Sequence, residues 1–196
     1  MCGICGIIGK SDRETLNAMV TAMRHRGPDD HGEFFSENVC LGMARLSIID
    51  TSRCGHQPMS NDTETVWIVY NGETYNFPEL RRSLEDRGYK FHSTSDTEVI
   101  LHLYEEFGDE CVTRMRGMFA FAIFDARDPK KPRLLIARDP VGIKPLLYSQ
   151  NQNGLIFASE MKSLLSSRLI APDIDPEAMR LRPPMRMPSR RSAARF

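Results

Sequence analysis

The 196-residue sequence has no long hydrophobic run, and no apolar stretch approaches the roughly 18 residues that a membrane-spanning helix requires. The first residues, MCGICGIIGK, lack a basic segment ahead of the apolar ones and do not form a secretory signal. We therefore expect a cytoplasmic protein with no membrane partner. Hydrophobic residues make up 41% and charged residues 27%, so a chain of this length can bury a core without disulfides or metal ions.

The sequence also lacks an excess charge, because 26 Lys and Arg residues balance 26 Asp and Glu residues. Six arginines lie in residues 180–196, which contain no acid, so the rest carries 20 basic and 26 acidic groups, a net charge of −6. This balance argues against a nucleic-acid-binding domain. Residues 179–196 have three prolines and no apolar period, so we expect a disordered basic tail after a domain spanning residues 2–178. A basic arm for nucleic acid is the alternative for this tail.

A disulfide framework is absent too, because the five cysteines are odd in number and irregularly spaced. Cys2 and Cys5 form a C-x-x-C pair, but a structural zinc site needs four ligands and the sequence has no second pair. A redox pair is disfavoured because the motif lies in a Gly-rich apolar run rather than at a helix N-terminus. We therefore expect free thiols and no metal site.

The spacing of apolar residues predicts both strands and helices. Strands are expected at residues 3–9, 33–36, 39–50, 65–70, 117–125, 133–138, 145–149 and 155–158. Helices are expected after a Ser11–Glu14 capping box, over residues 78–87, from Ser95 to Gly108 and over residues 160–166. Strands and helices do not alternate regularly, which favours sheets covered by helices over a series of βαβ units.

Cys2 is the most informative residue. A small residue after the initiator Met permits removal of that Met, which leaves Cys2 with a free α-amino group. Such an amine has a pKa of about 8, so its neutral fraction can accept the thiol proton directly or through water. Cys2 is thus a candidate nucleophile whose base is its own amine. The structural alternative is a small buried side chain at the start of a strand.

Eight sequence blocks occur in the order typical of one enzyme family: MCGICGIIG at 1–9, RHRGPDDHG at 24–32, ARLSIID at 44–50, YNGETYN at 70–76, SDTEVIL at 95–101, GMFAFAIFD at 117–125, RDPVGIKPLLY at 138–148 and FASEMKSLL at 157–165. Together they resemble the class II glutamine amidotransferase domain of glutamine-hydrolysing asparagine synthetases, over residues 2–178. The resemblance implies an α+β fold of the N-terminal-nucleophile hydrolase type. This fold is a four-layer αββα sandwich of two mainly antiparallel sheets.

The same resemblance implies that the domain hydrolyses the side-chain amide of glutamine through a Cys2 thioester, giving glutamate and ammonia. Asn71 and Gly72 would form the oxyanion hole, in which one donor is typically worth about 3–4 kcal/mol. Taken alone, Asn-Gly predicts a hairpin turn instead. A catalytically idle amino-acid-binding or regulatory remnant is the alternative for the whole domain.

The implied substrate-binding residues are Arg45, Leu46, Ser47, Ile48, Ile49, Asn71, Gly72, Glu73 and Asp96. Arg45 would bind the α-carboxylate of glutamine, and Glu73 and Asp96 would bind its α-ammonium. Taken singly, Arg45 is equally a solvated charge at a strand end, and Asp96 suits a helix N-terminus. One cation and two anions together complement a zwitterionic amino acid. Arg24, Arg26 and Asp29 are expected to organise the loop over this pocket, and His25 is expected to be structural.

The family's second domain, with its SGGxDS pyrophosphate loop, has no counterpart in the sequence. We therefore interpret the chain as truncated before an ATP-dependent synthetase domain. The glutaminase reaction is expected to need no cofactor, with ATP and Mg²⁺ confined to the missing domain. The expected partners are L-glutamine and a separate synthetase domain or subunit that receives ammonia. The sequence leaves a homodimer open.

Overall fold

Two antiparallel sheets form the middle of the protein, in a computed structural model that describes residues 1–9, 12–152, 154–173 and 194–195. The first sheet has the order β2–β3–β1–β9–β8, with bounds Asp30–Phe35, Val39–Arg45, Gly3–Gly9, Gly154–Ala158 and Leu147–Asn151. The second has the order β10–β7–β6–β5–β4, with bounds Ala194–Arg195, Arg133–Arg138, Gly117–Asp125, Val66–Thr74 and Met59–Ser60.

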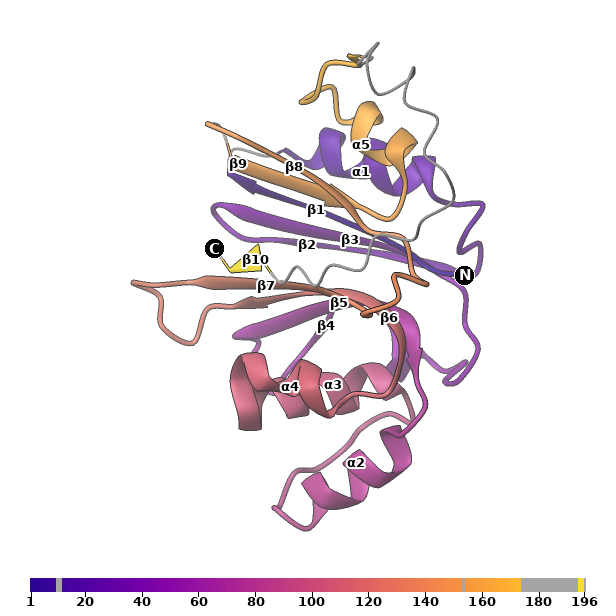
Figure 1. Ribbon diagram of the computed structural model, residues 1–196, viewed down its shortest axis with the longest axis vertical. Helices are drawn as coiled ribbons and strands as arrows, with labels where there is room; N and C mark the ends of the chain where they lie inside the picture. Colours follow the sequence, from indigo (N-terminus) through magenta and orange to yellow (C-terminus); the bar gives the residue numbers. More distant parts are fainter. Residues whose placement is uncertain (10–11, 153, 174–193, 196) are drawn as a thin grey trace.

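Helices cover the outer faces of both sheets (Figure 1). The first sheet is covered by α1 (Arg13–Ala22) and α5 (Met161–Ser166). On the outer side of the second lie α2 (Phe77–Glu85), α3 (Asp96–Phe107) and α4 (Cys111–Arg114). Two 3₁₀ turns, η1 (Arg53–Gly55) and η2 (Gly108–Glu110), lie between these elements. The expected α+β fold, a four-layer αββα sandwich, is confirmed.

Alternation along the strands separates the layers. In β6, Phe121 and Ile123 pack in a core with α3, whereas Ala122 and Phe124 pack in a core between the two sheets. Successive side chains of a strand point to opposite faces, so the run GMFAFAIFD fills two cores at once. A third core lies between the first sheet and α1 with α5.

Several predicted boundaries are wrong in informative ways. Helix α1 begins after Asp12, whose carboxylate accepts a hydrogen bond from the Thr15 N–H, and not after a Ser11 capping box. Residue 11 lies outside the described residues. Strand β2 begins at Asp30, three residues before the strand expected at residues 33–36. Asn71-Gly72 is no hairpin turn, because both residues lie inside β5 and pair with Ala120 and Phe119 of β6.

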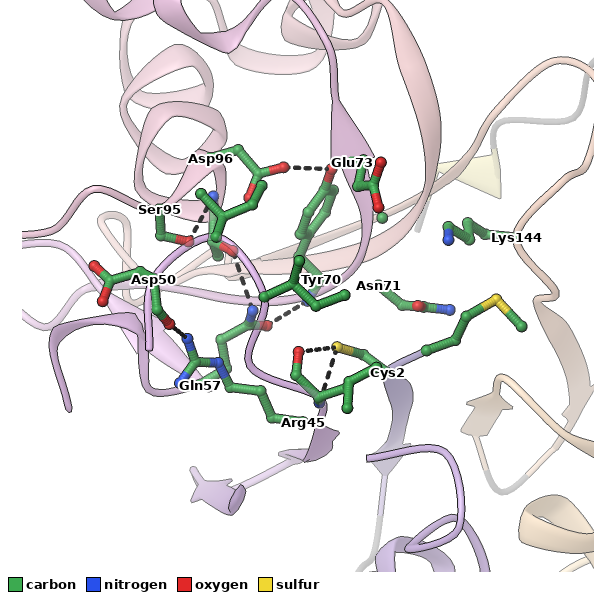
Figure 2. Close-up of a pocket in the computed structure, with 16 residues that line it drawn as sticks. Cys2, Arg45, Asp50, Gln57, Tyr70, Asn71, Glu73, Ser95, Asp96 and Lys144 are labelled. Atoms are coloured by element: carbon green, nitrogen blue, oxygen red, sulfur yellow. Dashed lines mark hydrogen bonds between the residues drawn. The ribbon is translucent and has the colours of Figure 1, made fainter. Parts of the chain in front are cut away.

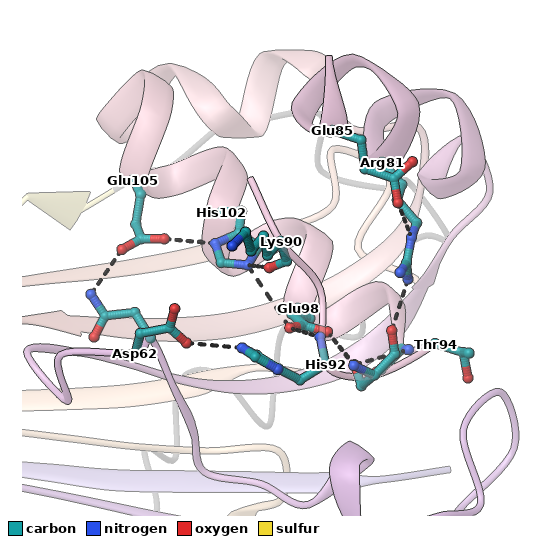
Figure 3. A network of polar contacts seen from close by, with 12 residues as sticks. Asp62, Arg81, Glu85, Lys90, His92, Thr94, Glu98, His102 and Glu105 are labelled. Atoms are coloured by element: carbon teal, nitrogen blue, oxygen red, sulfur yellow. Dashed lines mark hydrogen bonds and ion pairs between the residues drawn. The ribbon is translucent and has the colours of Figure 1, made fainter. Parts of the chain in front are cut away.

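A polar network fixes the loop that precedes α3 (Figure 3). Ser95 caps this helix as predicted, but Glu98 does not complete a capping box. The Glu98 carboxylate instead accepts hydrogen bonds from the His92 N–H (2.8 Å), the Ser93 N–H (2.8 Å) and the Ser93 hydroxyl (2.6 Å). The loop is thereby tied to the first turn of α3, where Asp96 lies.

The predicted disordered tail, residues 179–196, lies outside the described residues except for Ala194 and Arg195. These two residues form β10, which pairs with Ile136 and Leu135 of β7. In the part of the chain that the structure describes, no helix is long and apolar enough to cross a membrane.

Candidate active site

Cys2 lies just before β1, at the end of the sandwich that Figure 1 marks N, and Figure 2 shows its side chain among the pocket residues. The Leu46 N–H donates to the Cys2 Sγ at 3.4 Å, and the Arg26 Nε donates to the Cys2 carbonyl oxygen at 2.8 Å. Burial raises the pKa of the Cys2 thiol. The Leu46 N–H and the positive charges of the N-terminal amine, Arg45 and Lys144 oppose this rise. The thiol is therefore half-buried in a positively charged environment.

Cys2 lines a pocket at the same end of the sandwich (Figure 2). Its lining contains every predicted site residue except Ser47: Met1, Cys2, Arg45, Leu46, Ile48, Ile49, Asp50, Gln57, Tyr70, Asn71, Gly72, Glu73, Ser95, Asp96, Thr97 and Lys144. The Ser47 N–H instead donates to the carboxylate of Asp29, at 2.8 Å. Ser47 thus fixes the loop that Asp29 was expected to organise.

Asn71 reaches the pocket because of its position in β5. It lies two residues after Val69, which packs in the core between the sheets, so its side chain shares that face. Asn71 is only 1% exposed, and its Nδ2 has no hydrogen-bond partner among the described residues. Buried polar atoms are nearly always hydrogen-bonded. The free amide N–H groups therefore mark a place where a ligand oxygen fits.

The main chain of Gly72 points to the free edge of β5 beside this pocket. The Phe119 carbonyl and N–H, opposite Gly72, are both engaged with Asp139 (2.8 and 3.2 Å), so this pair exchanges no ladder bonds. Two residues to either side, the Tyr70 N–H donates to Gln57 (2.7 Å) and the Thr74 N–H to Asp96 (3.0 Å). The Gly72 N–H therefore points between these two acceptors, into the pocket. A Cβ at this position would lie 2.5 Å from the Met118 carbonyl oxygen.

Asp96 forms the acidic end of the pocket with Glu73. Burial raises the pKa of Asp96, although its carboxylate accepts hydrogen bonds from the Thr74 N–H (3.0 Å) and the Tyr70 hydroxyl (3.1 Å). Glu73 follows Asn71 on the same strand face and lines the same pocket. A buried carboxylate next to a second acid favours a positively charged ligand group.

Arg45 lies across the pocket from Glu73 (Figure 2). Its side chain is buried, and its guanidinium donates to the backbone carbonyl of Asp50. A Cβ at Gly55 would overlap with this guanidinium, so only glycine leaves room for it there. Burial acts to raise the pKa of Asp50, but hydrogen bonds from Ser52 and Thr94 outweigh it and lower the pKa to about 2. Arg45 is thus held by a loop whose Asp50 carboxylate is itself held by hydrogen bonds from Ser52 and Thr94.

Two pocket residues, Gln57 and Lys144, were not predicted as site residues. Gln57 joins two elements, because its amide accepts from the Tyr70 N–H (2.7 Å) and donates to the Thr97 hydroxyl (3.1 Å). Lys144 is buried in the pocket wall, in a loop whose N–H groups at Ile143 and Lys144 donate to the carboxylate of Asp139. Gln57 lies outside the eight sequence blocks, whereas Lys144 lies in the RDPVGIKPLLY block at 138–148, which did not mark it as a pocket residue.

Metal ligands are not grouped in this site. Among the described residues, no cluster of three or more His, Cys, Asp or Glu side chains is arranged to hold a metal ion. The chemistry that the pocket offers is a thiol, two free N–H donors, one fixed guanidinium and two carboxylates.

The amino-acid sequence is similar to curated asparagine synthetases. Asparagine synthetase [glutamine-hydrolyzing] 1 of Bacillus subtilis is 45% identical over 186 residues, covering 91% of this chain and 29% of the relative. Asparagine synthetase [glutamine-hydrolyzing] 2 of Oryza sativa subsp. japonica is 41% identical over 170 residues, covering 84% of this chain and 28% of the relative. The chain therefore spans less than a third of the length of these two relatives.

Among solved structures, the fold is similar to a glutamine phosphoribosylpyrophosphate amidotransferase from B. subtilis, in complex with ADP and GMP. The TM-score is 0.73 at 21% identity, covering 85% of this chain and 44% of that one. An allosteric regulatory enzyme of purine biosynthesis gives a TM-score of 0.70 at 20% identity, with coverages of 85% and 43%. The glutamine amidotransferase domain family matches residues 1–189. The chain therefore belongs to the glutamine amidotransferase domain family.

Proposed function

We propose that this chain hydrolyses the side-chain amide of L-glutamine, with Cys2 as the nucleophile. The observation that carries the proposal is the unpartnered Asn71 amide, buried beside the Cys2 thiol in a pocket that also holds Arg45, Glu73 and Asp96. The guanidinium complements an α-carboxylate, and the two acids complement an α-ammonium. A catalytically idle remnant would not need free N–H donors next to a thiol.

The reaction begins once Met1 is removed, which frees the Cys2 α-amine. The neutral amine accepts the thiol proton, and the thiolate attacks the amide carbon of glutamine. The Asn71 amide and the Gly72 N–H donate to the oxyanion that forms on the carbonyl oxygen. The protonated amine then gives its proton to the departing nitrogen, and ammonia leaves. Water hydrolyses the resulting thioester with the amine again as base, giving glutamate and the free thiol.

Glutamate release from glutamine by the full chain, with Met1 removal verified by intact mass, tests this proposal. Turnover that depends on Cys2 supports it. A Met-processed chain that binds glutamine but releases no glutamate contradicts it and indicates a binding or regulatory remnant.

The ammonia acceptor is proposed by analogy with the longer relatives. In a whole enzyme of that kind, ammonia would pass to an ATP-dependent synthetase domain or subunit, which would amidate activated aspartate to asparagine. ATP and Mg²⁺ would be needed there, and no cofactor for the glutaminase step. We also propose a cytoplasmic location and no nucleic-acid partner.

A further inference from the structure

Glu160 occupies the N-cap position of α5 without capping it. Its backbone is extended, as an N-cap requires, but its side chain makes no capping hydrogen bond. The carboxylate instead contacts the Arg26 Nη1 at 3.0 Å, the His25 Nε2 at 3.0 Å and the Lys162 Nζ at 3.3 Å. An N-cap residue whose side chain does not cap its helix is often explained by function.

Of these three partners, only Arg26 leads to the nucleophile. Its side chain is 9% exposed, and its Nε donates to the Cys2 carbonyl oxygen at 2.8 Å. The Arg26 side chain passes close to Gly3, where a Cβ would lie 3.3 Å from the Arg26 Cδ and 3.0 Å from Met23. One guanidinium therefore joins the Glu160 carboxylate to the main chain of Cys2.

The backbone at Glu160 is fixed to the same end of β1. The preceding residue, Ser159, donates its N–H to the Ile4 carbonyl (2.8 Å) and accepts from the Ile4 N–H through its hydroxyl (3.0 Å). Cys2 itself precedes Gly3, the first residue of β1 that pairs with another strand. Without further contacts, such a terminal residue would fray.

We infer that Glu160 is a positioning residue for the nucleophile, acting through Arg26 on the Cys2 carbonyl. With the carbonyl held, the thiol stays on the Leu46 N–H and beside Asn71. When the carboxylate is removed, Arg26 loses its anchor and the main chain of Cys2 gains freedom. The inference rests on the proposed glutaminase function for its kinetic consequence only.

The kinetic test compares Glu160→Leu and Glu160→Gln with Lys162→Leu, in the full chain with Met1 removed. We expect Glu160→Leu to lower kcat about 10-fold to 100-fold, because small displacements of a nucleophile are costly. KM should change less than about twofold, since Arg45 and Asp96 are untouched. Glu160→Gln keeps an oxygen for Arg26 and should retain an intermediate kcat. Lys162→Leu removes a contact on the outer side of the same carboxylate and should leave kcat unchanged.

A second readout is independent of glutamine hydrolysis. Labelling with iodoacetamide, followed by peptide mapping, should show faster modification of Cys2 in Glu160→Leu than in the parent. Exposed Cys54 serves as a reference, and buried Cys5 and Cys111 should stay protected in a folded variant. A parent that labels normally but does not hydrolyse glutamine would contradict the proposed function alone.

The inference is overturned if both Glu160 variants match Lys162→Leu in turnover and in Cys2 labelling. If Cys5 and Cys111 are also labelled in Glu160→Leu, that variant has lost its fold, and Glu160→Gln decides. Faster Cys2 labelling or lower kcat in a Glu160→Gln protein with protected buried thiols supports the inference. Parent-like values for both contradict it.

Discussion

Cys2 and Cys5 show how strand position separates a reactive thiol from a structural one. Cys2 lies beside the pocket, whereas Cys5 is fully buried in the core that α1 covers. We expect Cys2→Ala to lower glutamate release by at least about 1,000-fold, since no other thiol reaches the pocket. Cys5→Ala, assayed in parallel, should keep most of the activity at temperatures where it is folded. Turnover in Cys2→Ala, or its loss in folded Cys5→Ala, would disprove the role of Cys2.

Asn71 and Asp96 should differ in which kinetic constant they control. Asn71→Ala removes a donor that meets charge only in the transition state, so kcat should fall about 100-fold or more at similar KM. Asp96→Asn keeps an oxygen for the Thr74 N–H but removes the charge that meets the substrate ammonium. KM should then rise about tenfold or more with a smaller change in kcat. Steady-state kinetics that show the opposite pattern would exchange the two roles.

Lys144 provides a test of the electrostatics around Cys2. Its positive charge, like those of Arg45 and the N-terminal amine, lowers the thiol pKa against the effect of burial. Lys144→Met should therefore raise the pKa of Cys2 and move the pH profile of Cys2 alkylation to higher pH, by up to about one unit. Lys131→Met, an exposed change in the β6–β7 loop, is the control. Coinciding profiles for Lys144→Met and the parent would show that this charge does not influence the thiol.

At the scale of elements, the apolar periodicity of the sequence predicted strands well. It did not predict the contacts of single side chains in loops. The strand at 117–125 was predicted at its true bounds, because its alternating bulky and small residues fill two cores. Taken alone, Asn71-Gly72 predicts a hairpin turn. In the structure it lies within the nine residue pairs that join β5 to β6. Lys144 lines the pocket in a loop held by its N–H, which donates to the carboxylate of Asp139 five positions earlier. A contact of this kind leaves no periodic pattern in the sequence.

Glu98 should matter to the fold and, through α3, to substrate binding. Glu98→Ala leaves the buried N–H and hydroxyl of Ser93 and the partly buried N–H of His92 without an acceptor, which costs about 1–3 kcal/mol of unfolding free energy. The loosened loop should also raise the KM for glutamine, because Asp96 lies in the same helical turn. Urea unfolding and steady-state kinetics measure both effects.

The matched control is Glu85→Ala, which removes a partly exposed carboxylate paired with Arg81. Such surface pairs contribute less than about 1 kcal/mol, so this variant should unfold close to the parent. Equal stability of the two variants would show that the Glu98 network does not hold the loop.

At the scale of the whole molecule, acid unfolding should depend on Asp50. Its folded pKa of about 2 lies below the ordinary value of 3.8, so its carboxylate contributes stability above pH 4. That contribution, about 2–3 kcal/mol by linkage, is lost as the pH falls through 2. Asp96 acts in the opposite sense, because its raised pKa lowers stability above its unfolded value.

Asp50→Asn should therefore unfold more easily than the parent at pH 7 and show a shallower loss of stability between pH 4 and pH 2. Urea unfolding at several pH values measures both slopes. Parallel curves for the variant and the parent would exclude a linkage role for Asp50.

The overall architecture was predictable because the eight ordered sequence blocks are specific to a family with this sandwich. The positions of single side chains were harder to predict. Ser47 belongs to the same block as Arg45 and was expected to line the pocket, but its N–H binds Asp29. Gln57 lies in no such block, although it joins β5 to α3 through two hydrogen bonds. Such contacts depend on loops whose paths the local sequence does not specify.

The pairing of β1 has a consequence for the order of events during synthesis. Strand β1 precedes the other described strands in the chain, yet one of its two neighbours, β9, begins at residue 154. Until that neighbour emerges, β1 is the edge of an incomplete sheet, and Arg26 has no carboxylate at position 160 to contact. We therefore expect Met1 to stay accessible to an aminopeptidase until residues 154–160 have been synthesised. The contact from Glu160 through Arg26 to the Cys2 carbonyl forms only after residue 160 has been added, so we expect removal of Met1 to precede the fixing of the thiol.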